Sequence, residues 1–457
     1  MPGYVEDTIA AVATPPGVGA IAVIRVSGRA ALEIAGRVLR RNSGEAEAVG
    51  FSSHRARLAV LLEPATGTVI DQVLVLPMLG PRSFTGEDVV EIHCHGSVLI
   101  TDMTLRALLA AGARPARPGE FTERAFLNGK LDLCQAEAVA DLIEASSDAG
   151  RAAAWHLLAG GLSRQVLALR DAILDLRALV EAHLDFPEDD LPSDAEQEIA
   201  SGLAAAREAL TVLAATFARG RLAREGIRVA LIGKPNVGKS SLLNAILGRD
   251  RALVSAEAGT TRDYLEEPAA LGALRILLCD TAGLHAEAGA VERAGIERTI
   301  DVINAADAVV AVLDASRTLD AEDQVVIEAT IGRPRLFVRN KIDLAAAWPG
   351  DGSMVEVSAR TGQGLEALAG AIARVLPNAD MEPTTEAVVV TRARHHVALL
   401  AACAALGRSA LALDTAQGLE IVACEMQSAI LELDRLVGIS DVEQLLDRIF
   451  SRFCVGK

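Results

Sequence analysis

The sequence predicts a multidomain protein that combines two α/β regions with an all-α region. Short runs rich in Val and Ile, separated by Gly and Pro, fill the first 120 residues and indicate a mixed α/β domain. From about residue 121, apolar residues recur every three or four positions, which predicts long amphipathic helices. Between 228 and 378, strand-like runs alternate with helical segments, a pattern typical of a parallel sheet covered by helices.

Four runs near the N-terminus have the composition of strands, since β-branched residues dominate them and turn residues separate them. We therefore expect a small mixed α/β domain there. The runs are IAVIRV (21–26), LAVLL (58–62), VLVL (73–76) and VVEIHC (89–94).

A helical region follows, and its apolar positions are predicted to lie on one face of a single helix that ends near DFPEDDLP, because Pro187 and Pro192 prevent its continuation. A second helical stretch runs to about residue 218. The apolar face consists of Leu158, Leu162, Val166, Leu169, Ile173, Leu176 and Val180.

After PNADMEPTTEA (377–387) helical periodicity resumes and continues to the end of the sequence. The simplest organisation is an α/β domain inserted into a helical domain whose two halves pack together. The expected domains are an N-terminal α/β domain (1–120), the first helical half (121–220), the inserted domain (221–379) and the second helical half (380–457).

Composition limits the possible functions. The 457 residues carry a net charge of -17, which argues against broad nonspecific binding to nucleic acid or anionic membranes. The six cysteines are scattered without a CxxC pair, as expected of reduced thiols. With no long uninterrupted apolar run and no signal peptide, we expect a cytoplasmic protein without a membrane segment.

A phosphate-binding loop follows the first strand of the inserted domain. GKPNVGKSS (233–241) matches G-x-x-x-x-G-K-S between a predicted strand and a predicted helix. In such a loop the backbone amides converge on phosphates, Lys239 supplies positive charge, and Ser240 offers a hydroxyl to Mg²⁺. The candidate contacts here are Asn236, Val237, Gly238, Lys239, Ser240 and Ser241.

Further motifs in the expected order make this a guanine-nucleotide domain. In GTTRD, Thr261 is placed to complete a Mg²⁺ shell, and in DTAG, Asp280 reaches Mg²⁺ through water. In NKID, Asp343 can accept the two N–H donors that distinguish guanine from adenine, and SAR presents a backbone amide to the guanine oxygen. The remaining candidate GTP contacts are Ser255, Ala256, Glu257, Ala258, Gly259, Thr260, Thr261, Asp280, Thr281, Ala282, Gly283, Asn340, Lys341, Asp343, Ser358, Ala359 and Arg360.

The residue after DTAG is Leu284, which cannot orient an attacking water as the Gln of Ras-type GTPases does. Another residue must do so, and the acidic candidates are Glu287, Glu292 and Glu297. Asn236 is a candidate ligand for a monovalent cation between the phosphates, which would replace an arginine finger. Its alternative role is that of an ordinary turn former.

Motifs inside and outside this domain resemble those of the MnmE (TrmE) family of tRNA-modification GTPases. The resemblance extends along the whole chain, so a generic GTPase with unrelated flanks is disfavoured. The matching segments are ATPPGVGAIAVIRVSG (13–28), SFTGEDVVEIHCHG (83–96), RPGEFTERAFLNGKLDL (117–133), GKPNVGKSS, AGTTRD, DTAGL, VERAGIER and DRIFSRFCVGK (447–457).

The resemblance implies a homodimer that works with a flavoprotein, MnmG, in a heterotetramer or larger complex. Together they would install an aminomethyl or carboxymethylaminomethyl group on C5 of the wobble uridine of certain tRNAs. It also implies that 5-formyltetrahydrofolate, or a related one-carbon folate, binds the N-terminal domain, and that K⁺ triggers dimerisation of the GTPase domains and hydrolysis.

The same resemblance carries over to single residues. The water-orienting acid matches Glu292, and one departure is His285, where the family commonly has Arg. Positions matching the folate site are Arg25, Glu91, Lys130 and Lys457; those matching the K⁺ site are Asn236, Ser255, Glu257 and Thr260, and those matching the Mg²⁺ site are Ser240 and Thr261.

Other interpretations remain open. The GTPase motifs fit equally well a GTP-dependent binding switch, such as a ribosome-assembly factor, and a weaker alternative has the N-terminal domain transfer one-carbon units independently. His93, Cys94 and His95 resemble a metal triplet, but neighbours on a strand point to opposite faces and cannot converge on one ion. The arginines in RGRLAREGIR (219–228) suit tRNA phosphates and a solvated hinge equally.

The closing FCVGK raises the question of its cysteine. Gly456 and Lys457 do not fit a prenylation box, no polybasic cluster precedes it, and no partner cysteines suggest a metal site. We expect the preceding helix to deliver Cys454 and Lys457 to the folate pocket. There Lys457 would bind the folate, and Cys454 would take part in the modification chemistry.

Overall fold

The computed structural model describes residues 7–41, 50–184, 193–250, 266–271, 274–280, 302–350, 352–376, 388–440, 446, 449–451 and 453–456. The chain divides into two compact units. The first unit contains Met1–Ala140, Leu157–Leu210 and Ala398–Lys457, and the second contains Asp141–His156 and Thr211–Val397. Since these units divide the chain at other positions, the four domain boundaries drawn from the sequence stay a prediction.

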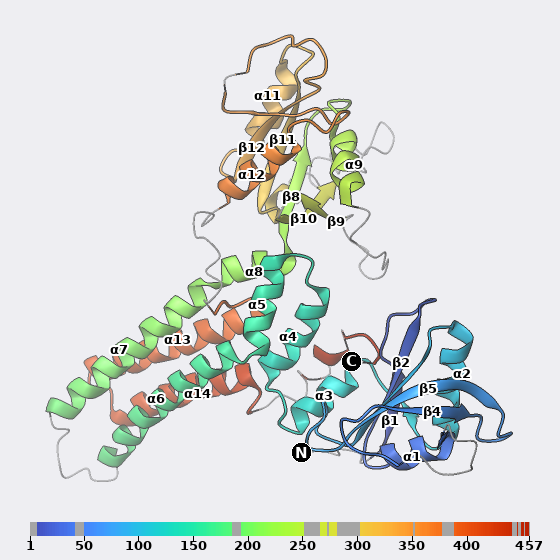
Figure 1. Ribbon diagram of the computed structural model, residues 1–457. Coiled ribbons are helices and arrows are strands. Elements are labelled where there is room, and N and C mark those ends of the chain that lie inside the picture. Colours follow the sequence, from blue (N-terminus) through green and yellow to red (C-terminus); the bar gives the residue numbers. More distant parts are fainter. Residues whose placement is uncertain are drawn as a thin grey trace, which may run out of the picture. The chain divides into compact units, whose positions relative to one another are not determined.

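The first unit contains a mixed seven-stranded sheet with the strand order β3-β4-β5-β6-β2-β1-β7 (Figure 1). All neighbours are antiparallel except β1 and β7. The four predicted strands are confirmed as β2, β4, β5 and β6, whereas β1, β3 and β7 were not predicted. The strands are β1 (Ile9–Val12), β2 (Ile21–Ser27), β3 (Leu39–Arg41), β4 (Arg57–Leu62), β5 (Val69–Met78), β6 (Val89–His95) and β7 (Arg114–Pro115).

Two helices, α1 (Ala31–Val38) and α2 (Val98–Ala110), cover one face of this sheet. Alternate strand residues such as Ile24 and Ile92 point into that core and are fully buried. On the opposite face, α3 (Glu120–Leu127) covers only the β1 side of the sheet, where its Phe121 packs on Ile9 and Ala11. The rest of this face is therefore available for ligands or partners.

A buried ionic network centred on Arg124 attaches α3 to the sheet. The Arg124 guanidinium lies 2.6 Å from Asp7, 3.1 Å from Glu120 and 3.2 Å from Glu87, and its side chain is 4% exposed. Arg114 pairs with both Asp7 and Glu120. Burial alone would raise the pKa values of Asp7 and Glu120, but hydrogen bonds from the two arginines outweigh burial and lower both pKa values.

Long helices form the rest of the first unit, and α6 packs along α14. Arg170 of α6 donates to Asp434 of α14 at 2.7 Å, so segments from the two predicted helical halves do pack together. Along the chain the helices are α4 (Leu133–Glu144), α5 (Asp148–Leu158), α6 (Gly161–Leu184), α7 (Ser193–Ala215), α8 (Phe217–Glu225), α13 (Ala393–Asp414) and α14 (Leu419–Val437); of these, α8 and most of α5 belong to the second unit.

The prediction of one helix from Leu158 to Val180 is wrong. The chain leaves the helix at Gly160, whose φ of 76° is left-handed, so α5 ends and a new helix begins at Gly161. The spacing of the apolar residues continued across this break and concealed it. Beyond the break Leu162, Val166, Ile173 and Val180 are fully buried, as the periodicity predicted.

Two helical segments, Asp194–Glu225 and Ala393–Asp414, are long and apolar enough to span a membrane by length and composition alone. The core helices of a water-soluble protein pass the same test, and both segments are partly buried against other elements here. Ala402, Ala405 and Leu406, for example, are almost completely buried inside α13. Packing within the protein therefore accounts for part of their apolar character.

The second unit contains a six-stranded sheet with the order β13-β12-β11-β8-β10-β9. Its strands are parallel except for β9, an antiparallel edge strand that was not predicted. Helices α9 and α12 pack on one face, and α11 lies against the other. The elements are β8 (Ile227–Ile232), α9 (Lys239–Asp250), β9 (Glu266–Leu271), β10 (Leu274–Asp280), β11 (Ala308–Asp314), α11 (Ala321–Glu328), β12 (Arg335–Asn340), β13 (Val355–Glu356) and α12 (Leu365–Val375).

We predict that Arg124→Ala destabilises the first unit by about 3–5 kcal/mol, because it leaves buried carboxylates without their counter-charge. Calorimetry should show a lower Tm for this unit. Asp7 and Glu120 have lower pKa values in the folded state than in the unfolded state. The stability that this difference contributes is fully present when the pH is above the unfolded-state pKa, and it is lost as the pH falls through the folded-state pKa. That loss on acidification should be smaller in the variant.

The control is Arg106→Ala, which removes an exposed pair with Asp102 on α2 that is worth less than about 1 kcal/mol. Equal Tm values for the Arg124 and Arg106 variants would contradict a structural role for the network.

Candidate functional site

The phosphate-binding loop connects β8 to α9. Gly233, Asn236 and Gly238 all have positive φ values, and a Cβ on Gly238 would lie 2.2 Å from the Asn340 side chain, so only glycine fits there. The Lys239 Nζ donates to the carbonyls of Gly233 and Lys234 at 2.8 and 2.9 Å. The loop thus has the shape of a phosphate cradle, and its lysine lies within the cradle.

Asn340 connects this loop to the predicted guanine-binding segments. Its side-chain amide donates to the Val237 carbonyl at 2.9 Å and accepts the Ala359 N–H at 3.1 Å. The side chain is buried, so both bonds are shielded from water. One of the SAR backbone amides, that of Ala359, is therefore hydrogen-bonded within the protein in this structure.

Lys341 extends along the nucleotide side of the same loop. Its ammonium lies 2.7 Å from the Asn236 carbonyl and 2.6 Å from the Asp314 carboxylate. Asp314 was missed in the sequence, although it ends β11 at the edge of the sheet where ligands bind in such folds. Burial would raise the pKa of Asp314, but hydrogen bonds from Lys341 and Ser316 lower it and hold the carboxylate ionised.

Asp343 is prepared to accept hydrogen bonds. The Ser358 hydroxyl donates to it at 2.7 Å and, as the main cause, lowers its pKa. Ser358 is itself fully buried, which fixes the position of that hydroxyl. A fixed, ionised carboxylate at the end of NKID suits the paired N–H donors of a guanine ring.

Ser240 and Ser241 are exposed in the first turn of α9, where backbone amides and the helix dipole favour a phosphate. The Ser240 hydroxyl is placed next to Lys239, which fits a Mg²⁺ ligand. Several predicted contacts lie outside the described residues, as does the side chain of Asp280. They are Ser255, Ala256, Glu257, Ala258, Gly259, Thr260, Thr261, Thr281, Ala282, Gly283, Glu292 and Lys457.

Lys234, in the second position of the phosphate-binding loop, was also missed. Its ammonium lies 2.6 Å from Asp320 and 2.7 Å from Asp323, the two residues that cap α11. The hydrogen bonds that Lys234 donates to both carboxylates raise its pKa. The loop is therefore attached to α11 on the far face of the sheet.

In the first unit, Arg25 and Glu91 face each other across β2 and β6 on the open side of the sheet. The guanidinium donates to the Glu91 carboxylate at 2.9 Å and lies 5.5 Å from the Phe84 ring and 5.6 Å from the Phe121 ring. The two side chains are 22% and 16% exposed. A half-buried charge pair beside aromatic rings fits a planar polar ring such as a pterin.

His93 belongs to the same face, because it lies two residues after Glu91 on β6. Its Nε2 lies 3.6 Å from the Glu91 carboxylate and, within the described part of the chain, has no hydrogen-bond partner although it is buried. Cys94 points into the core on the other side of the sheet, as the alternation of strand residues predicted. His93 is therefore a further candidate ligand contact that the sequence analysis did not select.

Lys130 lies beside the loop that carries Phe84. Its Nζ donates to the Pro81 carbonyl at 2.9 Å, and Gly86 packs against its methylene groups. Asn128 donates to the Thr85 carbonyl in the same loop. Three of the four predicted folate residues, Arg25, Glu91 and Lys130, thus border the loop from residue 81 to 87, while Lys457 lies outside the described residues.

The C-terminal tail attaches to this domain. Val455 forms an antiparallel bridge with Pro118, and the Gly119 N–H donates to the Cys454 carbonyl. A Cβ on Gly456 would lie 2.1 Å from the carbonyl of Val12, the last residue of β1. Upstream, Phe450 and Phe453 pack on Leu133 and Ala136 of α4.

The tail therefore lies near the Arg25 pair. Arg25 of β2 is the register partner of Ala11 of β1, which directly precedes Val12. By strand spacing, the Gly456 backbone therefore lies within roughly 10 Å of the Arg25 backbone. The Cys454 side chain is exposed rather than packed. The delivery of this thiol to the predicted folate pocket stays a prediction.

The arginines of the segment 219–228 are used within the second unit. Arg221 pairs with Asp307 and Glu225, while Arg224 pairs with Asp141 and Glu225. Arg221 and Arg224 are therefore held in ion pairs, whereas the sequence had left open a role at tRNA phosphates and one in a solvated hinge.

Comparison with known proteins agrees with this geometry. Residues 8–130 match the family model described as "GTP-binding protein TrmE N-terminus", and residues 133–454 match "MnmE helical domain". The chain belongs to the MnmE (TrmE) family. It is 41% identical to the "tRNA modification GTPase MnmE" of Geobacter sulfurreducens, over 99% of this chain and all of that protein.

A second MnmE relative, from Opitutus terrae, is 43% identical over 99% of both chains. Among solved structures, Era from Aquifex aeolicus is 27% identical, covering 39% of this chain and 66% of that one with a TM-score of 0.27. The sequence predictions of the MnmE family, of the multidomain fold and of a GTPase are confirmed, and this MnmE-family chain is a GTPase.

We predict that Asp343→Asn lowers GTP affinity about 100-fold or more, because two hydrogen bonds from the guanine ring to a charged acceptor are lost. The new amide can donate to the C2 oxygen of xanthine, so binding of xanthosine triphosphate should appear. Fluorescent nucleotide titrations measure both affinities.

Glu366→Gln is the matched control, since it removes the same charge from an exposed position in the first turn of α12. GTP affinity in the Asp343 variant within a few-fold of the wild-type value would remove this residue from the base-recognition site.

Proposed function

We propose that this MnmE-family chain is a K⁺-stimulated GTPase that acts with the flavoprotein MnmG on tRNA in the cytoplasm. The product would be an aminomethyl or carboxymethylaminomethyl group on C5 of the wobble uridine. The relatives' printed name, tRNA modification GTPase, supports the tRNA role. The full-length similarity supports extending that role to this chain.

The observation that carries this proposal is the attachment of the FCVGK tail beside the Arg25 and Glu91 pair. A nucleotide switch alone needs neither the pair nor the tail. Residues 455 and 456 contact Pro118 and Val12 beside β1, and the Cys454 thiol is exposed, which supports a role for this thiol at the Arg25 and Glu91 pair. An exposed thiol next to a ligand site is suited to chemistry on that ligand.

In the N-terminal site, Glu91 would accept N–H donors from the pterin ring of a one-carbon folate, and the Phe84 and Phe121 rings would flank it. Arg25 orients the Glu91 carboxylate through its hydrogen bond. Lys130 and Lys457 would bind the anionic part of the folate. The folate supplies the one-carbon unit when bound, and Cys454 acts from the docked tail.

In the GTPase domain, Lys239 and the loop amides would bind the phosphates, and Ser240 with Thr261 would hold Mg²⁺. Asn236, Ser255, Glu257 and Thr260 form the proposed K⁺ site. Glu292 would orient the attacking water in place of the absent glutamine.

The open face of the sheet supports a homodimer. Around the Arg25 pair this face exposes apolar side chains that a monomer leaves in water, among them Leu58, Leu74 and Ile21, which are 51%, 41% and 62% exposed. Leu58 and Leu74 are register partners on β4 and β5, so they form one contiguous patch. A second copy covering this patch would remove them from water and enclose the folate site.

We predict that GTP turnover is faster in K⁺ than in Na⁺ at equal ionic strength, because the smaller ion would not fit ligands spaced for K⁺. Glu292→Ala should reduce turnover about 100-fold or more while GTP affinity is unchanged. Steady-state phosphate release and nucleotide titration measure the two effects.

Glu297→Ala, on the same segment, is the control and should retain turnover. Equal turnover rates in K⁺ and Na⁺ would rule out a role for K⁺ in hydrolysis. Full activity of the Glu292 variant would mean that another residue orients the attacking water.

We predict that Cys454→Ser preserves GTP hydrolysis but abolishes wobble-uridine modification, because the thiol acts in the modification and not at the nucleotide. Chromatography of nucleosides from tRNA of a deletion strain carrying each variant measures this. Cys424→Ser, which removes another exposed thiol, should restore normal tRNA.

Normal nucleosides with Cys454→Ser would return the thiol to a passive role. Unchanged nucleosides in the deletion strain itself would favour a GTP-dependent binding switch instead.

A further inference from the structure

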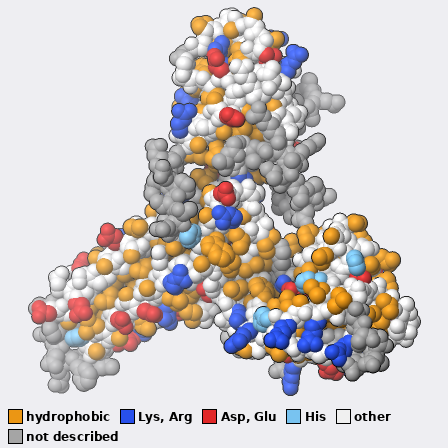
Figure 2. Space-filling model, viewed as in Figure 1, with side chains coloured by type: hydrophobic (Ala, Val, Ile, Leu, Met, Phe, Trp, Pro, Cys, Tyr) orange, Lys and Arg blue, Asp and Glu red, His pale blue; other side chains and the backbone are white. Residues whose placement is uncertain are grey.

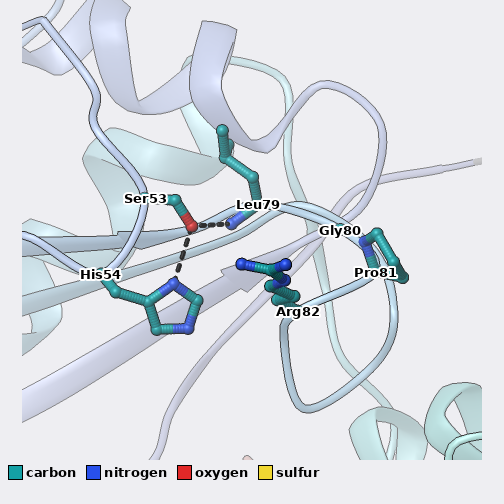
Figure 3. A pocket seen from close by; sticks show the side chains of 6 residues that line it. All are labelled: Ser53, His54, Leu79, Gly80, Pro81 and Arg82. Atoms are coloured by element: carbon teal, nitrogen blue, oxygen red, sulfur yellow. Dashed lines mark hydrogen bonds between the residues drawn. The ribbon is translucent and has the colours of Figure 1, made fainter.

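A cavity of about 550 Å³ lies at one end of the sheet domain, between the turn before β4 and the loop after β5 (Figure 3). Nothing in the assignments above uses it. The lining residues are Ser53, His54, Leu79, Gly80, Pro81 and Arg82.

The side chains of this cavity suit an anion. Figure 3 shows the Arg82 guanidinium reaching from the loop toward Ser53 and His54. The lining contains no carboxylate, and across the residues that the structure describes no acidic side chain pairs with Arg82. Ser53 hydrogen-bonds His54 Nδ1 at 2.8 Å, which leaves Nε2 for a ligand.

The backbone holds these groups in place. His54 has a φ of 59°, a left-handed value that is strained for histidine, and its N–H donates to the Pro77 carbonyl. The Ser53 hydroxyl also accepts the Leu79 N–H at 3.0 Å. The turn and the loop are therefore joined by hydrogen bonds, and the strained conformation that directs the imidazole is maintained by them.

The cavity adjoins the proposed folate site. Pro81, which lines it, accepts a hydrogen bond from Lys130. Leu76 of β5 is the register partner of Glu91, and Leu79 follows three residues later, which corresponds to roughly 10 Å along a strand. A ligand whose ring lies at Glu91 and whose chain passes Lys130 would thus extend toward the cavity.

The surrounding charge also favours an anion. The whole chain has a net charge of -17, yet Lys and Arg side chains gather on the visible face of the sheet domain in Figure 2. Arg55 and Arg57 follow His54 directly and are exposed. These arginines close to His54 add positive potential that attracts carboxylates, while the Asp88 carboxylate beside the cavity is occupied by the Gly80 N–H at 2.9 Å.

We propose that this cavity binds the carboxylates of a glutamate chain on the one-carbon folate, so that the protein prefers polyglutamylated folates. The proposal rests on the proposed folate site. A chain carboxylate would meet the Arg82 guanidinium in paired hydrogen bonds, and the His54 Nε2 would add one more. The ring contacts at Arg25 and Glu91 would be the same for short and long chains.

The test is calorimetric binding of 5-formyltetrahydrofolate carrying one or three glutamates. The full-length wild-type protein should bind the triglutamate about tenfold more tightly, the gain expected of one charge-assisted carboxylate contact. Arg82→Gln and His54→Asn should each reduce this preference to less than about threefold while monoglutamate affinity stays unchanged. Asn tolerates the left-handed conformation, so the second variant keeps the turn.

Arg106→Gln, which neutralises an exposed arginine on α2, is the matched control and should retain the full preference. The preference should also fall as salt rises, because screening weakens attraction between exposed charges. A preference that survives Arg82→Gln, or equal wild-type affinities for the two folates, overturns the proposal and leaves the folate site intact. No binding of either folate overturns the folate site itself and this proposal with it.

Discussion

The Arg124 guanidinium, buried among three carboxylates, is the interaction on which the N-terminal half of the protein depends. It connects the start of the sheet at Asp7, the loop at Glu87 and the helix at Glu120. Burial raises the pKa of Glu87, so ionising this residue has a cost that Arg124 must offset. Because Phe84 and Lys130 border the same loop, the proposed folate site has its shape only while this network is intact.

In the GTPase domain, two side chains likewise fix the positions of separate segments: the neutral amide of Asn340 and the charged ammonium of Lys234. The Asn340 amide joins the phosphate loop to the segment that carries Ser358, so base recognition and phosphate binding share one rigid contact. Lys234 extends this rigidity to α11 through the two aspartates that cap that helix. A nucleotide that displaces Lys239 from the loop carbonyls therefore acts on elements at both faces of the sheet.

Local sequence patterns predicted many of the strands and much of the nucleotide site. Strand composition located β2, β4, β5 and β6, and motif spacing located the phosphate loop and the base-recognition segments. The helix break at Gly160 escaped because apolar spacing continued through it. The short strands β1, β3 and β7 escaped because their pairing depends on distant partners. His395 lies at the start of α13, where its sequence position favours a solvated side chain, yet tertiary packing buries it completely.

The ion pairs were the least predictable part of the sites. The partners of Arg221 and Arg224 are up to 86 residues away, so no local pattern shows that these arginines are neutralised. Asp314 and His93 were missed for a related reason. Asp314 becomes a site candidate only when the segment after the neighbouring strand β12 brings Lys341 beside it, and His93 only when Arg25 of β2 pairs with Glu91 on the same face of the sheet.

The docked tail also has a consequence for the order of events during synthesis. Val455 binds a segment near Pro118 that leaves the ribosome more than 300 residues earlier. The sheet domain and the GTPase domain have both been synthesised before residue 454 arrives, so Cys454 reaches its position only after both of them. A fragment released early could bind nucleotide, yet it would carry no thiol beside the Arg25 pair, and incomplete molecules would be unable to start the chemistry proposed for that thiol.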